Sequence, residues 1–149
     1  MTSELKLEKA QKQEDIKEIY NFNVKAFADS QDFAWTQDNI SKEIKAGWEL
    51  YSAKVGEEIV CAIFLKKEND VLMTKNTPIK INHQGNGFSH LIKDFYEDLA
   101  KKEGIFVVKN YCPEDNFRMV ALNERHDYTK TGKILADKNT LIEWEKKLK

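Results

Sequence analysis

The chain has 149 residues, of which 41% are hydrophobic and 11% aromatic, enough to bury one core and too few for two independent ones. Lysine and arginine number 24 against 25 acidic residues, so the net charge is -1 and no basic excess favours nucleic acid or an anionic membrane. We therefore expect a single globular domain over residues 1–149 that binds neither nucleic acid nor membrane.

The apolar runs indicate the cellular compartment of the protein, and the cysteine spacing indicates whether it binds a metal. No apolar segment approaches the roughly 20 residues that span a bilayer, and the stretch MTSELKLEKAQ lacks the apolar run of a signal peptide. Cys61 and Cys112 are in neither a CxxC nor a Cys/His ligand spacing, which argues against a disulfide framework and a zinc site. These features predict a cytoplasmic protein without a bound metal.

The first half of the chain predicts a strand, two helices and a meander. LKLEKA alternates as a short strand does, and from Asp15 onward apolar residues recur with a helical period. A shorter helix follows Thr36, a suitable N-cap, and closes at Gly47. ELYSAKV and IVCAIFLKK, joined by GEE, predict a hairpin, and END turns the chain into a third antiparallel strand, VLMTKNTPIKI.

The second half predicts a unit of loop, helix and strand. Residues 81–95, INHQGNGFSHLIKDF, lead from a glycine loop into a helix that ends at Gly104. IFVVKNY is typical of a buried strand, residues 116–125 of a short helix, and YTKTGKILADKNTLIEWEKKLK of two strands with a charged tail. The fold class is α+β. The apolar stripe expected on the helix after the glycine loop consists of Leu91, Ile92, Phe95 and Leu99.

The glycine loop fits neither of the two most familiar phosphate-binding patterns. A dinucleotide fingerprint requires a third glycine where this chain has His90, and a Walker A loop requires an earlier glycine that Gly132-Lys133 lacks. What remains is a loop facing the first-turn N–H groups of a helix, which with the positive helix end bind an anion without any basic side chain. A pyrophosphate fits such a site, and the alternative is a plain strand-to-helix turn.

The loop and a second motif together resemble the GNAT superfamily of acyl-CoA-dependent N-acyltransferases. The family's loop motif is Gln/Arg-x-x-Gly-x-Gly/Ala, and QGNGFS matches it at Gln84 and Gly87, with Ser89 at the last small position. NFRMVALNERHDY resembles the family's last motif, Asn-x-x-Met-x-x-x-Asn, although HD stands where relatives have Leu-Gly. The resemblance extends from Leu5 to Tyr128.

The resemblance implies a fold and a cofactor. The fold would be a mixed, mostly antiparallel sheet of six to seven strands with about four helices, whose central strands splay apart at the cofactor site. Acetyl-CoA would be the co-substrate, with its pantetheine arm paired to an exposed strand edge. The residues that the resemblance assigns to cofactor binding are Ile79, Ile81, Gln84, Gly85, Asn86, Gly87, Phe88, Ser89 and Asn116.

The implied reaction transfers an acetyl group from acetyl-CoA to a primary amine of a small molecule, peptide or protein; a homodimer is left open. Many relatives carry a Tyr, the proton donor to the leaving thiolate, at the position of Asn123, and an amide cannot donate as an acid. The candidate substitutes are Tyr128, which is preferred, Tyr111 and His126. No Asp or Glu occurs in IFVVKNY or VLMTKNTPIKI, so we expect water to deprotonate the attacking amine.

Several of these residues also have purely structural interpretations. Asn116 is a suitable helix cap, Asn123 a candidate solvated helix residue, and Cys112 a candidate inert strand-end thiol. His83 and His126 are more often surface histidines than bases. Without the family's usual Tyr, a catalytically silent acyl-CoA-binding or interaction domain is the alternative function. Three aromatic residues are expected in the core unless they line an acceptor pocket: Phe33, Trp35 and Trp48.

Overall fold

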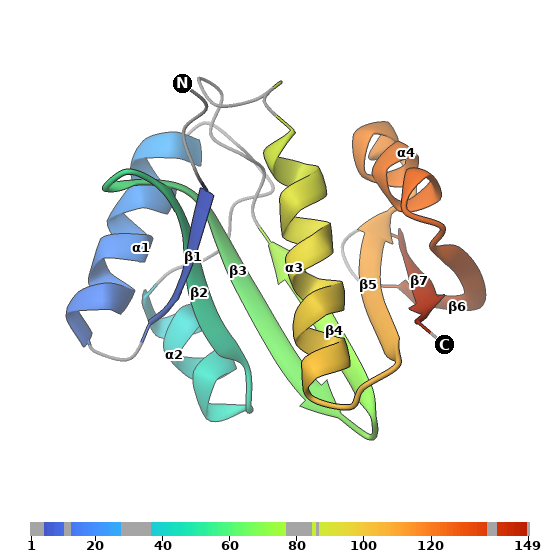
Figure 1. The fold of residues 1–149 in the computed structure, drawn as a ribbon. Coiled ribbons are helices and arrows are strands. Elements are labelled where there is room, and N and C mark those ends of the chain that lie inside the picture. The colour runs from blue at the N-terminus through green and yellow to red at the C-terminus, as the bar shows by residue number, and fades with distance from the viewer. Residues whose placement is uncertain are drawn as a thin grey trace. The chain divides into compact units, whose positions relative to one another are not determined.

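The computed structural model describes residues 5–10, 13–27, 37–76, 85, 87–136 and 140–148, and this part contains four helices and seven strands. The chain divides into two compact units (Figure 1). One unit comprises Met1–Lys66 with Asn76–Phe88, and the other comprises Lys67–Lys75 with Ser89–Lys149. The predicted class, an α+β fold with a mostly antiparallel sheet of seven strands and four helices, is confirmed.

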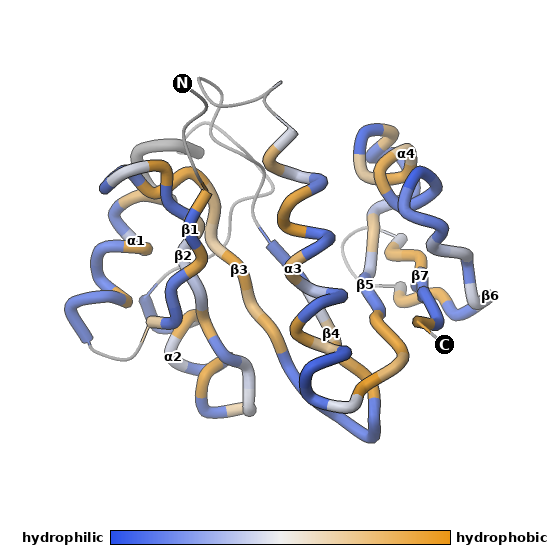
Figure 2. The backbone as a smooth tube through the Cα atoms, viewed as in Figure 1, coloured by the Kyte–Doolittle hydropathy of each residue, from blue (hydrophilic) through white to orange (hydrophobic). Residues whose placement is uncertain are grey.

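The first unit packs two helices on three antiparallel strands. Strands β1 (Leu5–Lys9), β2 (Glu49–Val55) and β3 (Glu58–Glu68) pair in that order, all antiparallel. Helices α1 (Gln13–Phe27) and α2 (Gln37–Lys45) lie against them (Figure 1). Figure 2 shows β3 as a nearly continuous apolar stretch. The core of this unit consists of Ile19, Phe22, Ile40, Leu50, Ile59, Ala62 and Phe64.

The local signals predicted in this unit are partly confirmed. Gly47 follows α2 with a φ of 103°, which an L side chain rarely adopts, so it closes the helix as expected. Trp48 packs against the core, with its ring centroid 6.3 Å from that of Phe64. Thr36, Phe33 and Trp35 lie outside the described residues.

The second unit combines four strands with two helices. Strands β4 (Val71–Asn76) and β5 (Val107–Pro113) pair in parallel, β5 and β7 pair antiparallel, and β7 pairs antiparallel with β6. The strand order is therefore β4-β5-β7-β6, with the last strand in sequence inserted between two earlier ones. The remaining elements are α3 (Phe88–Lys102), α4 (Phe117–Arg125), β6 (Thr129–Ala136) and β7 (Thr140–Lys147).

Strands β4 and β5 part before either of them ends. Their ladder runs from Val71 opposite Val107 to Thr74 opposite Asn110, where the Thr74 hydroxyl donates to the Lys109 carbonyl over 3.1 Å. Strand β5 continues to Pro113, paired with β7. This is the predicted splay of the central strands, and within the described part of the chain Asn110 is the last residue of β5 to pair with β4.

The buried face of α3 matches the predicted stripe in part, since Ile92 is buried and Phe95 and Leu99 are half-buried. Leu91, however, is 46% exposed. The buried residues form a row along α3 in which each lies four positions after the last: Phe88, Ile92, Tyr96 and Ala100. Lys93 and Glu97, each one position beyond this row, are buried too. Among the described helices, none has the length and apolar character needed to span a membrane.

Candidate active site

Two glycines at the start of α3 adopt backbone conformations that only glycine adopts readily. Gly85 has a φ of 85° and Gly87 a φ of 78°, and α3 begins at the following residue, Phe88. A Cβ added to either glycine would meet no atom within 4 Å among the described residues. The first turn of α3 contains no acidic residue, so nothing in that turn opposes an anion. Phe88 is buried and Ser89 half-buried.

Four predicted cofactor-binding residues lie outside the described residues: Ile79, Ile81, Gln84 and Asn86. Asn116 lies at the N-terminus of α4, where its Oδ1 accepts a hydrogen bond from the Met119 N–H over 3.2 Å. The capping interpretation of Asn116 is therefore confirmed, and its amide NH₂ is the group that the cap does not use.

Asn123 lies beside the point where β4 and β5 part. Its side chain is 0% exposed and pairs reciprocally with Asn110: Nδ2 of Asn110 donates to Oδ1 of Asn123 over 3.0 Å, and Nδ2 of Asn123 donates back over 3.1 Å. The interpretation of Asn123 as a solvated helix residue is wrong. Its burial follows from the packing of α4 on β5, which helical periodicity within α4 does not reveal.

Lys93, which no motif in the sequence singled out, completes this cluster. The Lys93 ammonium is buried and donates a hydrogen bond of 2.9 Å to Oδ1 of Asn123, while lying 4.2 Å from the centroid of the Tyr128 ring. Burial lowers the pKa of Lys93 to about 8, although the Glu97 carboxylate partly raises it. A Lys and a Glu four residues apart usually mark a solvated helix face, so no sequence signal indicated this burial.

Tyr128, the preferred proton donor, is buried with its hydroxyl lacking a hydrogen-bond partner among the described residues. Burial, with a smaller contribution from Glu97, raises the pKa of this phenol well above its ordinary value. Its backbone N–H donates to the Asn123 carbonyl over 2.9 Å. Tyr128 therefore lies in the Asn123 cluster as a neutral phenol.

Tyr111 lies on the other face of β5 from Asn110, because side chains alternate along a strand. Its hydroxyl donates a 2.5 Å hydrogen bond to Oε2 of Glu143 on β7, and burial together with this bond raises the pKa of Tyr111 to about 12. Burial alone would raise the pKa of Glu143, but hydrogen bonds from Tyr111, Thr131 and Lys109 hold it below its ordinary value. The structure thus separates Tyr111 from Asn123 and Tyr128, and reveals a carboxylate beside β5 that the sequence analysis missed.

The histidine and cysteine candidates differ in their surroundings. Nε2 of His126 lies 2.7 Å from Nδ1 of His90, and burial, followed by His90, lowers the pKa of His126. Cys112 is buried and donates to the Pro113 carbonyl over 3.3 Å, and burial raises its pKa to about 11, as expected of an inert thiol. His83 lies outside the described residues.

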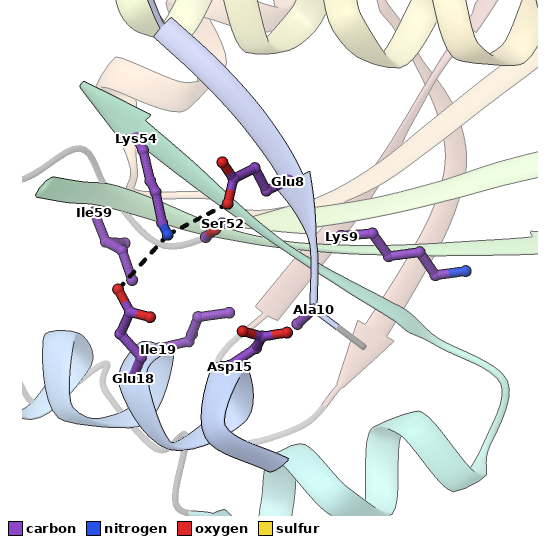
Figure 3. Close-up of a pocket in the computed structure, with 9 residues that line it drawn as sticks. All are labelled: Glu8, Lys9, Ala10, Asp15, Glu18, Ile19, Ser52, Lys54 and Ile59. Carbon is purple, nitrogen blue, oxygen red and sulfur yellow. Dashed lines mark ion pairs between the residues drawn. The ribbon is translucent and has the colours of Figure 1, made fainter. Parts of the chain in front are cut away.

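A small pocket in the first unit contains none of the predicted site residues (Figure 3). The Lys54 ammonium points into it and forms ion pairs of 3.3 Å with Glu8 and 3.6 Å with Glu18. These contacts connect β1, β2 and α1, so the pocket has a structural explanation. Within the described ranges, no group of three or more His, Cys, Asp or Glu side chains is arranged to hold a metal ion.

Comparisons with known proteins identify the fold. No family model and no curated protein matches the sequence. The structure, however, matches the ribosomal-protein-S18-alanine N-acetyltransferase of Escherichia coli with a TM-score of 0.81 at 12% identity, over 97% of this chain and 94% of that one. The chain has the GNAT fold.

Other GNAT structures match over nearly their whole length. A putative phosphinothricin N-acetyltransferase gives a TM-score of 0.78 at 16% identity, over 98% of this chain and 99% of that chain. A Bacillus subtilis acetyltransferase in complex with CoA gives 0.70 at 18% identity, over 97% and 99%. At these identities the similarity shows the fold alone. The chemistry must be inferred from the site itself, namely from the parting strands, the glycine loop and the Asn110–Asn123 pair.

Proposed function

We propose that this protein is an N-acetyltransferase that transfers the acetyl group of acetyl-CoA to a primary amine of a small molecule, peptide or protein. The observation that carries the proposal is the parting of β4 and β5 after Thr74 and Asn110, followed along the chain by a glycine loop at the start of α3. Parted strands leave main-chain groups for an extended arm, and a helix N-terminus suits a phosphate. Solved structures of the same fold are named as acetyltransferases with acetyl-CoA or CoA bound.

The proposed cofactor site uses the loop and the segment that precedes it in the chain. The first-turn N–H groups of α3 and the backbone of residues 84–89 would take the pyrophosphate, and Ile79 and Ile81 would offer main-chain groups to the pantetheine. Asn116 would contribute its amide NH₂, since its oxygen caps α4. No metal is required, because the loop can neutralise phosphate charge through backbone donors alone.

The proposed acceptor is an amine whose identity stays open. Proteins of this fold are named for acceptors as different as the alanine of ribosomal protein S18 and spermidine or spermine. The amine must be neutral to attack, and the oxyanion that forms needs a hydrogen-bond donor. We further propose that residues 1–149 act as one cytoplasmic domain. Whether this domain forms a homodimer is left open.

Two measurements test this function. CoA or acetyl-CoA at about a hundred times its dissociation constant should raise the free energy of unfolding by about 2.7 kcal/mol, seen as a higher melting temperature. Mass spectrometry of a panel of amines incubated with acetyl-CoA should then detect acetylated product. Absence of a thermal shift at millimolar CoA would contradict cofactor binding, whereas a shift without product from any amine would favour a catalytically silent acyl-CoA-binding domain.

A further inference from the structure

The burial of the Lys93 ammonium is not explained by the packing of the fold. Lys93 is 4% exposed, yet among the described residues its Nζ has a single hydrogen-bond acceptor, Oδ1 of Asn123, and no carboxylate within ion-pair distance. Its other contact is the face of the Tyr128 ring. The nearest acid along α3, Glu97, instead accepts a 2.8 Å hydrogen bond from Lys146. A buried ammonium without a paired carboxylate destabilises a fold, so a ligand that benefits from the charge is the natural explanation.

The position of this charge indicates where it acts. Lys93 donates a hydrogen bond to Asn123, and Asn123 is hydrogen-bonded to Asn110, which is the last residue of β5 seen to pair with the described part of β4. The ammonium is therefore two hydrogen bonds away from the point where the strands part. Under the proposed function, on which this inference rests, that opening receives the thioester end of acetyl-CoA.

We propose that Lys93 is the proton donor to the thiolate that leaves during acetyl transfer. The neutral amine attacks the thioester carbonyl carbon, the new C–N bond forms, and the C–S bond breaks with its electron pair going to sulfur. A proton from the Lys93 ammonium passes to that sulfur. The surplus proton on the acetylated nitrogen goes to water, and neutral Lys93 regains a proton from water, so the net products are the amide and the CoA thiol.

The acidity of the ammonium suits this step better than that of the neighbouring groups. The pKa of Lys93, about 8, is close to the roughly 8.5 of a free cysteine thiol, to which we liken the thiol of CoA, so the proton is transferred with little energetic penalty. The pKa of the Tyr128 phenol is raised far above that of the thiol, and the amide of Asn123 has no acidic proton. Tyr111 lies on the opposite face of β5, and its hydroxyl donates its hydrogen bond to Glu143.

The decisive measurement is the pKa of the thiol of bound CoA, read from thiolate ultraviolet absorbance with the complex of desulfo-CoA as the blank. A cation beside the sulfur should lower the thiol pKa by about one unit or more relative to free CoA. Lys93→Met, which keeps the length of the side chain without the charge, should abolish that shift while CoA still raises the melting temperature. Lys101→Met, on the exposed last turn of the same helix, is the matched control and should retain the shift.

Turnover provides a second measurement. Lys93→Met should lower kcat about a hundredfold, because a positioned general acid contributes on that order, and Lys101→Met should change kcat less than twofold. If CoA binds the parent protein but its thiol keeps the pKa of free CoA, Lys93 does not meet the sulfur and the inference is wrong, whether or not Lys93→Met folds. If CoA does not bind at all, the proposed function fails and this inference with it.

Discussion

Lys93 couples the chemistry of the candidate site to the stability of the protein. In the unfolded chain its pKa returns to about 10.5, whereas burial holds it near 8 in the folded state. Below pH 8 both states carry the charge, and the folded state bears the cost of burying it. Between pH 8 and 10.5 the folded state loses the proton first, so this residue makes the protein more stable as pH rises.

We therefore expect the parent protein to gain stability relative to Lys93→Met as pH rises from 7 to 10.5, by up to about 3 kcal/mol. Urea unfolding of both proteins at several pH values measures the difference, in which the titrations of groups that do not interact with Lys93 cancel; the Cys112 thiol does interact with Lys93 and is replaced by Ala in both proteins. At pH 7 the variant should be at least as stable as the parent, because a Met side chain needs no counter-ion. A constant difference across this range would contradict the lowered pKa.

The two candidate phenols should respond differently to loss of their hydroxyl groups. Tyr111→Phe removes a short hydrogen bond to an ionised carboxylate and should lower the free energy of unfolding by about 1.5 to 3 kcal/mol. Tyr128→Phe removes a buried hydroxyl without a described partner and should change stability by less than about 0.5 kcal/mol or increase it. Thermal or urea unfolding of the two variants side by side gives the comparison, and equal losses would mean that Tyr128 has an acceptor.

Among the structural elements, the junction between the glycine loop and α3 is the one most specific to function. Both glycines there have a positive φ, and so does Gly56 in the turn between β2 and β3. At Gly87 and Gly56 alike, an added Cβ would meet no described atom within 4 Å. Substitution at either position thus strains the backbone to a similar extent, and only at Gly87 does it obstruct the proposed phosphate site.

Gly87→Val and Gly56→Val should therefore each cost on the order of 1–3 kcal/mol of stability through backbone strain. Gly87→Val should also abolish the increase in melting temperature with CoA, whereas Gly56→Val should retain the full increase. Differential scanning fluorimetry with and without CoA measures both effects. Normal CoA binding by Gly87→Val would mean that the loop is only a turn between β4 and α3.

At the scale of the whole molecule, the question is whether the two compact units unfold together. The proposal of a single domain requires one cooperative transition, and tryptophans provide a probe in each unit: Trp48 packs on the first core, and Trp144 is buried on β7. Trp35 complicates the fluorescence and must be replaced in both reporters.

Two double variants serve as reporters: Trp35→Phe/Trp144→Phe leaves Trp48, and Trp35→Phe/Trp48→Phe leaves Trp144. In each variant, the urea midpoint measured by tryptophan fluorescence should equal the midpoint measured by circular dichroism. In each variant CoA should move the fluorescence and dichroism midpoints together, because a ligand stabilises every part of a cooperative unit equally. A fluorescence transition that separates from the dichroism transition would contradict a single domain over residues 1–149.

The sequence by itself determined the local elements of this protein and the composition of its loop. Helix periodicity, the cap at Asn116 and the turn glycines depend on neighbours within a few residues, so residues 13–27, 88–102 and 117–125 were predicted nearly to their ends. The two motifs, read in order, led to the GNAT fold that the solved structures match.

Only the tertiary structure decided which polar groups meet. Periodicity indicates that a helix has a buried face, but the exact face depends on what packs there, which is why Leu91 is exposed while Lys93 and Asn123 are buried. The insertion of β7 between β5 and β6 brings Glu143 to Tyr111 across 32 positions of sequence, a pairing that no local pattern encodes. The candidate chemistry depends on such long-range contacts, because hydrogen bonds between side chains form only after distant elements have packed.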